Sequence, residues 1–203
     1  MDLSGQKIFI IGLGKTGLAT ARFLAKQQAR ITVADQKTPE GIENALTELR
    51  DAGIFFDIVP YDVMSLHHID MVIPSPGVPP HDPLLIEAVR KSIPVHSELE
   101  IACRFLKPPM VAITGTNGKT TTTTLTGQLL KDAGKKVFVG GNIGIPLIEY
   151  CEGPQNEDFA VVEVSSFQLQ WVTAFHARCA VLLNTTCDHV NYHGSFAAYQ
   201  EAK

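Results

Sequence analysis

Short apolar runs recur along the chain and alternate with stretches in which apolar residues have helical spacing. Lys7 to Ile11 is a continuous β-branched and aromatic run, which is typical of a strand buried on both faces of a sheet. Similar runs lie at 31–34, 55–59, 71–73, 110–113, 137–139, 159–164 and 179–183. A helical pattern such as 83–90 separates several of them. The alternation predicts an α/β fold built on parallel sheets.

The first apolar run leads into Gly12-Leu13-Gly14-Lys15-Thr16-Gly17, and the second ends at Asp35. A G-x-G-x-x-G sequence between a strand and a helix, followed about twenty positions later by an acidic residue, is typical of a nucleotide diphosphate site. Taken alone it suggests NAD, and a glycine turn that serves only packing is the alternative. The loop Ser75 to Pro80 follows another strand, so it is either a second wall of this site or a proline-stiffened connection.

A second glycine-rich turn lies within Val111 to Thr124, which reads VAITGTNGKTTTTT. Gly115 and Gly118 let the backbone fold around oxyanions, and the following helix turns its N-terminal N–H groups to the same place. Lys119 supplies a point charge for phosphates, and the Thr120 hydroxyl can reach a phosphate-bound Mg²⁺. The pattern therefore favours nucleotide binding over a glycine turn with a surface lysine. Ile113, however, stands where the common phosphate-loop pattern has its first glycine.

The turn Gly140-Gly141-Asn142-Ile143-Gly144 is unusually rich in glycine, so Asn142 either contacts a substrate or occupies a left-handed turn position. Glu163 is one carboxylate in an apolar run. Burial of that charge would be costly without a cation, and a Mg²⁺ shared with Thr120 would offset the cost. A solvent-facing strand end is the alternative.

Two further positions keep two interpretations each. Ser165 either caps the next helix or contacts a ligand. His189 follows the last apolar run, where it is placed to bind a metal or substrate, or simply faces solvent.

Two nucleotide-type turns predict two domains, assigned to 1–96 and 97–203. A helix beginning near Ser97 cannot continue through Lys107-Pro108-Pro109, which is expected to be the linker. The chain stops at Lys203 inside a helical pattern without a stop signal, which predicts that it belongs to a longer enzyme.

Composition narrows the function classes. A net charge of −4 provides no basic face for nucleic acid. No apolar run reaches the roughly 20 residues that span a bilayer, and the N-terminus lacks a secretion signal. The four cysteines have no C-x-x-C spacing, so neither a zinc site nor a disulfide framework is expected. We therefore expect a cytoplasmic protein with no membrane or nucleic-acid partner.

Several motifs together resemble the Mur ligase family and cover the whole chain. They are Gly-Leu-Gly-x-Thr-Gly at 12–17, Ser-Pro-Gly at 75–77, Gly-Thr-Asn-Gly-Lys-Thr-Thr at 115–121, Gly-Gly-Asn-Ile-Gly at 140–144, Glu-Val-Ser-Ser-Phe-Gln-Leu at 163–169 and Asn-x-Thr-x-Asp-His at 184–189. The family uses the shorter loop G-T-x-G-K-[ST], which accounts for Ile113. Cys187 and Asn191 depart from the acidic residues found there in many relatives.

The resemblance implies a Rossmann-like domain for a UDP-linked substrate, followed by the first portion of a P-loop ATPase domain. The rest of that domain and a C-terminal domain are expected to be missing. The implied reaction is a step of peptidoglycan synthesis: ATP phosphorylates the carboxylate of UDP-N-acetylmuramoyl-L-alanine, and the amine of D-glutamate attacks the acyl phosphate. Cofactors would be ATP and Mg²⁺, the protein would be a monomer, and these 203 residues alone would show no turnover. An NAD-linked oxidoreductase and a non-catalytic nucleotide-binding module remain as alternatives.

The site residues implied by the resemblance follow the same motifs. ATP would be bound by Gly115, Thr116, Asn117, Gly118, Lys119, Thr120 and Thr121. The UDP-linked substrate would be bound by Lys15, Thr16, Asp35, Gln36, Lys37, Gly77, Asn142 and Ser165. One Mg²⁺ would be held by Thr120 and Glu163, and a second by His189 and Lys203, the lysine being carbamylated by CO₂ in the family. The implied catalytic residues are Lys119, His189 and Lys203.

Overall fold

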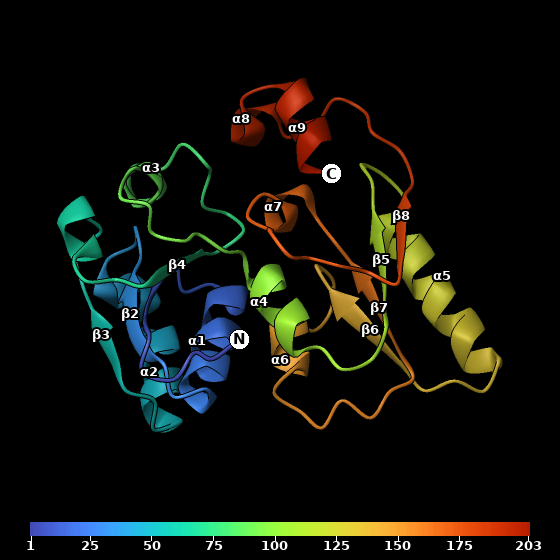
Figure 1. Ribbon diagram of the computed structural model, residues 1–203, viewed down its shortest axis with the longest axis horizontal. Coiled ribbons are helices and arrows are strands. Elements are labelled where there is room, and N and C mark those ends of the chain that lie inside the picture. Colours follow the sequence, from blue (N-terminus) through green and yellow to red (C-terminus); the bar gives the residue numbers. More distant parts are fainter. The chain divides into compact units, whose positions relative to one another are not determined.

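The computed structural model describes residues 1–203 and contains two parallel sheets of four strands each (Figure 1). The predicted α/β class is therefore confirmed. The chain divides into two units, Met1–Glu98 and Leu99–Lys203, and each unit contains one of the sheets.

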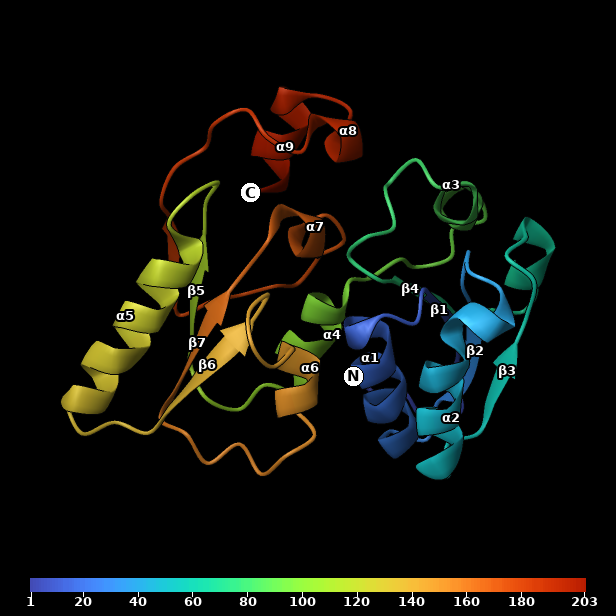
Figure 2. The ribbon, with the colours of Figure 1, turned by 180° about the vertical axis from the view of Figure 1, so that it is seen from behind.

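In the first unit the strand order is β3-β2-β1-β4. Its elements are β1 (Lys7–Ile11), α1 (Lys15–Lys26), β2 (Arg30–Ala34), the 3₁₀ helix η1 (Pro39–Ile42), α2 (Glu43–Asp51), β3 (Phe56–Ile58), the 3₁₀ helix η2 (Val63–Leu66), β4 (Met71–Pro74) and α3 (Pro83–Arg90). β1 is central, and its residues from Ile8 to Ile11 are completely buried, as its continuous apolar sequence predicts. α1 packs against β1 and β2, with α2 beside it (Figure 2).

The strand register of the first unit brings three chain segments to one edge of the sheet. Ile11 at the end of β1 pairs with Ala34 on β2 and with Pro74 on β4. The residues that follow these ends are Gly12, Asp35 and Ser75. The glycine turn, the acidic residue and the proline-rich loop therefore meet at the carboxyl edge, where parallel sheets bind ligands.

In the second unit the strand order is β6-β7-β5-β8. Its elements are α4 (Glu98–Phe105), β5 (Met110–Thr114), α5 (Lys119–Asp132), β6 (Val137–Gly141), α6 (Leu147–Tyr150), β7 (Phe159–Glu163), α7 (Ser166–Leu169), β8 (Cys179–Leu182), α8 (Val190–His193) and α9 (Phe196–Ala202). α5 lies along one face of this sheet (Figure 1). Gly127 on α5 permits the close approach, because a Cβ there would lie 2.3 Å from Cγ2 of Val139 on β6.

The expected linker at Lys107-Pro108-Pro109 is wrong, because the division falls at residues 98 and 99. α4 belongs mainly to the second unit, in which Glu100 accepts hydrogen bonds from the backbone N–H groups of Thr173 and Ala174 at 3.0 and 3.1 Å. Gln155 accepts a further bond from Lys107 N–H at 2.8 Å. The prolines end α4, but tertiary contacts hold them inside the second unit.

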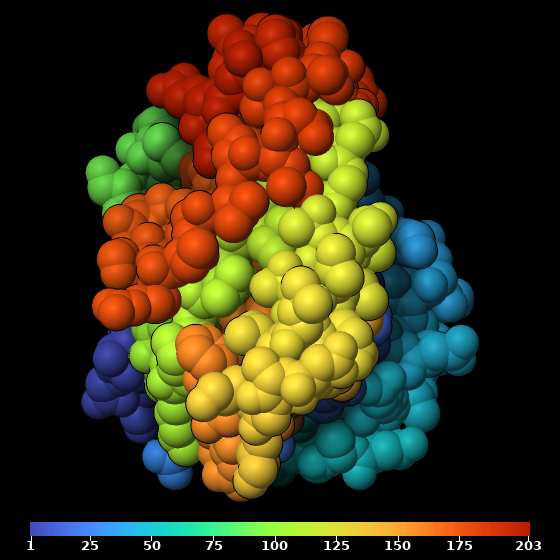
Figure 3. Space-filling view, turned by 90° about the vertical axis from the view of Figure 1, so that its right-hand side faces the viewer, coloured from blue at the N-terminus to red at the C-terminus, as the bar shows by residue number.

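Part of the second unit leaves apolar side chains exposed. Leu125 and Leu129 on α5 are 55% and 60% exposed, and Figure 3 shows the outer face of this helix in yellow. The edge strand β8 is also mostly exposed, including Leu182. No helix combines the length and the apolar composition that crossing a bilayer requires.

Candidate nucleotide sites

The glycine turn of the first unit is closed by the neighbouring loop. Gly12 has φ of +87°, and its carbonyl accepts a hydrogen bond from the Ser75 hydroxyl at 2.8 Å. A Cβ on Gly17 would lie 2.1 Å from the same carbonyl oxygen, so only glycine fits there without distortion. The Ser75 loop thus contacts the turn directly.

Asp35 ties two segments of this edge together. Its Oδ2 accepts from Leu13 N–H at 2.8 Å, and its Oδ1 accepts from Lys37 N–H at 2.9 Å. The side chains of Lys15, Gln36 and Lys37 are exposed beside these contacts. Asp35 therefore shapes the turn through backbone bonds.

A polar cluster lies next to Gln36. The Tyr61 hydroxyl donates to Asp82 Oδ2 at 2.7 Å, and Gln36 Nε2 lies 3.4 Å from both groups. Burial and the neighbouring Asp82 carboxylate raise the pKa of Tyr61. Asp82 also caps α3, accepting from Leu84 N–H at 2.9 Å. This cluster anchors the segment that follows β2, although the sequence assigned no role to Tyr61 or Asp82.

In the second unit, residues 115–118 form the loop between β5 and α5, here called the phosphate loop. Gly118 has φ of +82° and caps α5. A Cβ on Gly115 would lie 3.0 Å from Cβ of Leu183, so the loop packs closely on the segment after β8. The first helical bond joins Thr122 N–H to Gly118 C=O. The N–H groups of residues 119–121 therefore have no helical acceptor, which is the arrangement that binds anions at a helix N-terminus.

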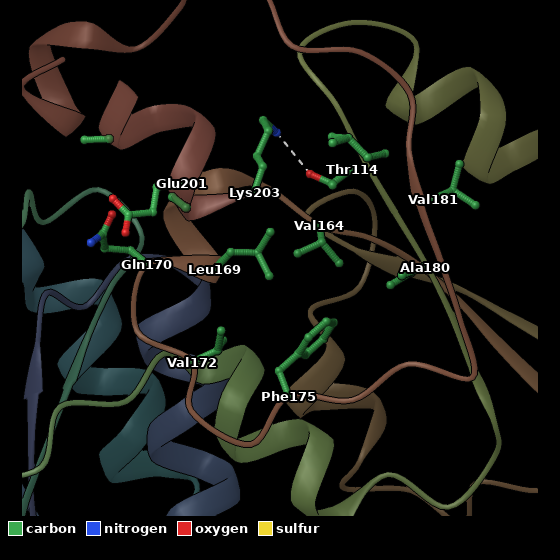
Figure 4. A pocket seen from close by; sticks show the side chains of 14 residues that line it. Thr114, Val164, Leu169, Gln170, Val172, Phe175, Ala180, Val181, Glu201 and Lys203 are labelled. Carbon is green, nitrogen blue, oxygen red and sulfur yellow. Dashed lines mark hydrogen bonds between the residues drawn. The ribbon is translucent and has the colours of Figure 1, made fainter. Parts of the chain in front are cut away.

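Two lysine ammonium groups lie at the phosphate loop. Lys119 Nζ donates to the carbonyls of Gly115 and Thr116, both at 2.9 Å. Lys203 Nζ donates to Thr114 Oγ1 at 3.0 Å (Figure 4). It also donates to Gly115 C=O at 3.0 Å. Burial, together with the nearby Lys119 charge, lowers the pKa of Lys203 to about 8. The loop thus carries positive charge before any anion binds.

Lys203 and Thr114 also form the polar end of a pocket of about 640 Å³ within the second unit. Val164, Leu169 and Phe175 contribute apolar wall, and Gln170 and Glu201 add further polar groups (Figure 4). The pocket therefore adjoins the phosphate loop through one lysine.

Glu163 is buried, with 1% exposure, at the end of β7. Its Oε2 accepts from Thr120 Oγ1 and its Oε1 from Asn142 Nδ2, both at 2.7 Å. The solvent-facing alternative for Glu163 is therefore wrong. So is the left-handed alternative for Asn142, because Gly141 (φ +100°) and Gly144 (φ +62°) occupy those positions.

The oxygen atoms at Glu163 and Thr120 fit a cation that takes most of its ligands from a bound nucleotide and water. No group of three or more His, Cys, Asp or Glu side chains is arranged to bind a metal ion by itself. Mg²⁺ on a nucleotide takes most of its ligands from phosphates and water, and needs only one or two protein oxygens. The Glu163 carboxylate and the Thr120 hydroxyl, which are in contact, supply such oxygens.

His189 and Ser165 were each left with two interpretations by the sequence. His189 has a left-handed backbone (φ +52°) at the start of α8, and its exposed ring packs on Phe167 with 4.7 Å between ring centroids. Ser165 caps α7 in a capping box with Gln168. The structure therefore shows the capping role of Ser165, whose hydroxyl accepts from Gln168 N–H at 3.3 Å.

Sequence reasoning assigned no role to two residues that hold the phosphate loop. Asn184 bonds to the backbone of Asn117, and its position just after β8 was a usable signal. Tyr199 is 1% exposed, and its hydroxyl lies 2.8 Å from Thr116 Oγ1. Nothing local in the sequence distinguishes Tyr199 from a core aromatic residue.

Two family models match the chain. The model described as the N-terminal domain of MurD-like Mur ligases matches residues 6–97, and the model of the Mur ligase middle domain matches residues 113–203.

Similar curated proteins include the UDP-N-acetylmuramoylalanine--D-glutamate ligases of Syntrophus aciditrophicus and Geobacter metallireducens, which are 59% and 47% identical to the chain. Each comparison covers 100% of this chain and 45% of the relative. The chain therefore spans somewhat less than half the length of these relatives.

Solved structures with a similar fold include a UDP-N-acetylmuramate:L-alanyl-gamma-D-glutamyl-meso-diaminopimelate ligase from Neisseria meningitides, with a TM-score of 0.54 and 21% identity. That match covers 98% of this chain and 66% of the other. A UDP-N-acetylmuramate-alanine ligase from Thermotoga maritima matches with a TM-score of 0.51 and 23% identity, over 97% and 45% of the two chains. These likenesses support the fold, and the resemblance expected from the motifs is confirmed by the family models. With both of its units matched by models of Mur ligase domains, the chain belongs to the Mur ligase family.

Proposed function

We propose that this chain serves in an ATP-dependent ligase that joins D-glutamate to UDP-N-acetylmuramoyl-L-alanine through an acyl phosphate. The first unit would bind the UDP-linked substrate, and the second would bind ATP and Mg²⁺. The observation that carries the ATP site is the Thr120–Glu163 contact at the start of α5, directly after a loop that holds Lys119. The names of the relatives support the choice of substrates.

The physical obstacle in this reaction is the approach of a carboxylate to a phosphate. Two like charges about 4 Å apart repel each other by roughly 4 kcal/mol at an effective dielectric constant of 20. Lys119 would leave the loop carbonyls and contact the terminal phosphates, while the free N–H groups at the start of α5 bind phosphate oxygens. Mg²⁺, when bound, supplies further positive charge, and Thr120 and Glu163 would hold it.

Lys203 would contribute after modification. A lysine whose pKa is about 8 has a much larger neutral fraction near neutral pH than an ordinary lysine, and only the neutral amine reacts with CO₂. The resulting carbamate would supply an anionic oxygen, which with His189 would hold a second Mg²⁺. In its unmodified form the ammonium bonds to Thr114 and Gly115.

In the first unit, the UDP-linked substrate would contact the glycine turn and the residues that follow β2 and β4. The diphosphate would bind at the turn near Lys15 and Thr16, and the uridine near Asp35, Gln36 and Lys37. Gly77, from the loop that closes this edge, would contribute one wall. Asn142 and Ser165 are the proposed contacts for the muramoyl end. We further propose that the protein acts as a cytoplasmic monomer on small molecules.

Titration calorimetry on the 203-residue chain tests the two sites separately. UDP-N-acetylmuramoyl-L-alanine and UDP are expected to bind, and G17A should abolish this binding because the added Cβ meets the Gly12 carbonyl. Mg·ATP is expected to bind in the unchanged chain and in G17A, but more weakly in K119M.

Two alternative functions give different results in the same series. Tight quenching of NADH fluorescence without UDP binding would favour an NAD-linked oxidoreductase. We expect no phosphate release that requires both UDP-N-acetylmuramoyl-L-alanine and D-glutamate from these 203 residues alone. Release that requires both substrates would contradict the view that more of the relatives' length is needed for turnover.

A further inference from the structure

The phosphate loop is paired along one side with the chain segment that follows β8. Thr114 at the end of β5 is the register partner of Leu182 at the end of β8. Beyond the sheet, Leu183 N–H donates to Thr114 C=O and Thr116 N–H donates to Asn184 C=O, both at 3.0 Å. The ladder between the two strands therefore continues into the loop.

The Asn184 side chain extends this pairing by one more step. Its Oδ1 accepts from Asn117 N–H, and its Nδ2 donates to Asn117 C=O, both at 3.0 Å. Because Asn117 presents both a donor and an acceptor, only one orientation of the Asn184 carboxamide fits, since the reversed amide would place like groups together. The carboxamide therefore bonds to the backbone N–H and C=O of the exposed Asn117, as the backbone of a neighbouring strand would.

These bonds act on the loop just before its nucleotide-binding end. They occupy the N–H groups of Thr116 and Asn117, so the groups left for an anion are those at the start of α5. Without Asn184, the N–H and C=O groups of Asn117 would lose these two hydrogen bonds, and the backbone before Gly118 would gain conformational freedom. Nucleotide binding would then have to order the loop, and the entropic cost of that ordering would weaken the affinity for the nucleotide.

We infer that Asn184 is a positioning residue that holds the phosphate loop in its nucleotide-binding shape without touching the nucleotide. This inference rests on the proposed ATP site for its consequence in binding. Its structural part, the ordering of the loop, does not depend on which nucleotide binds.

The test uses the 203-residue chain with two matched substitutions. In N184D the side chain keeps its size, but a carboxylate oxygen faces Asn117 C=O. N156D makes the same chemical change at an exposed asparagine of the same unit. Amide hydrogen exchange of the loop and calorimetry with Mg·ATP and with UDP are measured for all three proteins.

A carboxylate oxygen of N184D can still accept from Asn117 N–H, but the other oxygen repels Asn117 C=O, so the loop should open more often. We therefore expect faster exchange of the Asn117 amide in N184D than in N156D, with unchanged exchange in the strand β5. Mg·ATP should bind N184D at least about tenfold more weakly. The bond from the side chain to Asn117 C=O is lost, and a carboxylate oxygen faces that carbonyl oxygen instead. UDP binding should be the same in all three proteins.

A pH series separates positioning from a general loss of structure. Lowering the pH from about 7.5 to about 5 protonates part of the introduced carboxyl, whose ordinary pKa is about 4. The protonated form can donate to Asn117 C=O, so Mg·ATP affinity of N184D relative to N156D should recover.

Each outcome bears on a different claim. Equal Asn117 exchange in N184D and N156D, or equal Mg·ATP affinity of N184D and the unchanged chain, would overturn the inference. If the unchanged chain binds no Mg·ATP, the proposed function is contradicted, and the exchange comparison alone decides whether Asn184 orders the loop.

Discussion

At the scale of single residues, the candidate ATP site is built from polar groups that bond to one another. Glu163 is buried and its two oxygens accept from Thr120 and Asn142. Neutral donors stabilise a carboxylate less than a cation does, so the buried charge is only partly compensated. Glu163 is thus placed for cation binding at some cost to folding.

Substituting Glu163 should separate folding from binding. In E163Q the new amide can accept from Asn142 and donate to the Thr120 hydroxyl, and the buried charge is gone. We expect the free energy of unfolding in urea to stay within about 1 kcal/mol of the unchanged chain, or to rise. Mg·ATP affinity measured by calorimetry should fall at least about tenfold, since a carboxylate ligand is lost. A large loss of stability, or unchanged affinity, would contradict this.

Lys203 should make stability depend on pH. Its pKa falls from 10.5 to about 8 on folding, so between these values the unfolded chain binds the proton more readily. The free energy of unfolding should therefore rise with pH from about 8 to 10.5, and the contribution is unfavourable below that window. Urea unfolding at several pH values should show a shallower rise in K203M than in the unchanged chain. K135M, at an exposed lysine, should retain the full rise. Parallel curves for all three would count against the pKa shift.

At the scale of elements, α5 shows how packing overrides local preference. After Lys119 its sequence has a run of five threonines, and it also contains Gly127; threonine and glycine are both weaker helix formers than alanine. The helix nevertheless runs from Lys119 to Asp132, because it packs on β6 and β7. Glycine is required at position 127, because a Cβ there would collide with the side chain of Val139.

A double substitution tests this contact. G127A raises helix propensity by about 1 kcal/mol, yet its Cβ would lie 2.3 Å from Val139 Cγ2. We expect a net loss of about 1–3 kcal/mol in the free energy of unfolding, as for other overpacked sites. V139A removes the colliding methyl group, so G127A should cost less in the V139A background. The four proteins of this cycle can be compared by urea unfolding, and additive effects would refute the contact.

At the scale of the whole molecule, the chain consists of two units with separate sheets and separate candidate sites. Each site lies at the carboxyl edge of its own sheet, because the glycine turn follows β1 and the phosphate loop follows β5. The units should therefore respond separately to their ligands.

Ligand-dependent hydrogen exchange should show this separation. UDP at about 100 times its Kd should raise protection of the β1–β4 core by up to about 2.7 kcal/mol. Mg·ATP should protect β5, β7 and α5 instead. Mixed protection of both cores by either ligand would show that the two units unfold as one.

Much of this protein is already determined by local sequence. Apolar runs such as Lys7 to Ile11 specify buried strands because period and β-branching act over a few residues. Glycines at 12, 17, 115 and 118 specify turns, because only they adopt the backbone or spacing required there. The apolar neighbours of Glu163 favoured its burial but left a solvent-facing strand end open, and the folded structure decided for burial.

The tertiary structure decided the contacts between distant residues. The neighbouring positions of β5 and β8 bring Asn184 to Asn117, and folding of α9 brings Tyr199 to Thr116. The division between the units falls at residues 98 and 99, close to the expected boundary at 96 and 97, and contacts of α4 with residues 173–174 place the prolines at 107–109 inside the second unit instead of in a linker. Such pairings depend on strand order and packing over many tens of residues, which no local pattern of apolar and polar positions records.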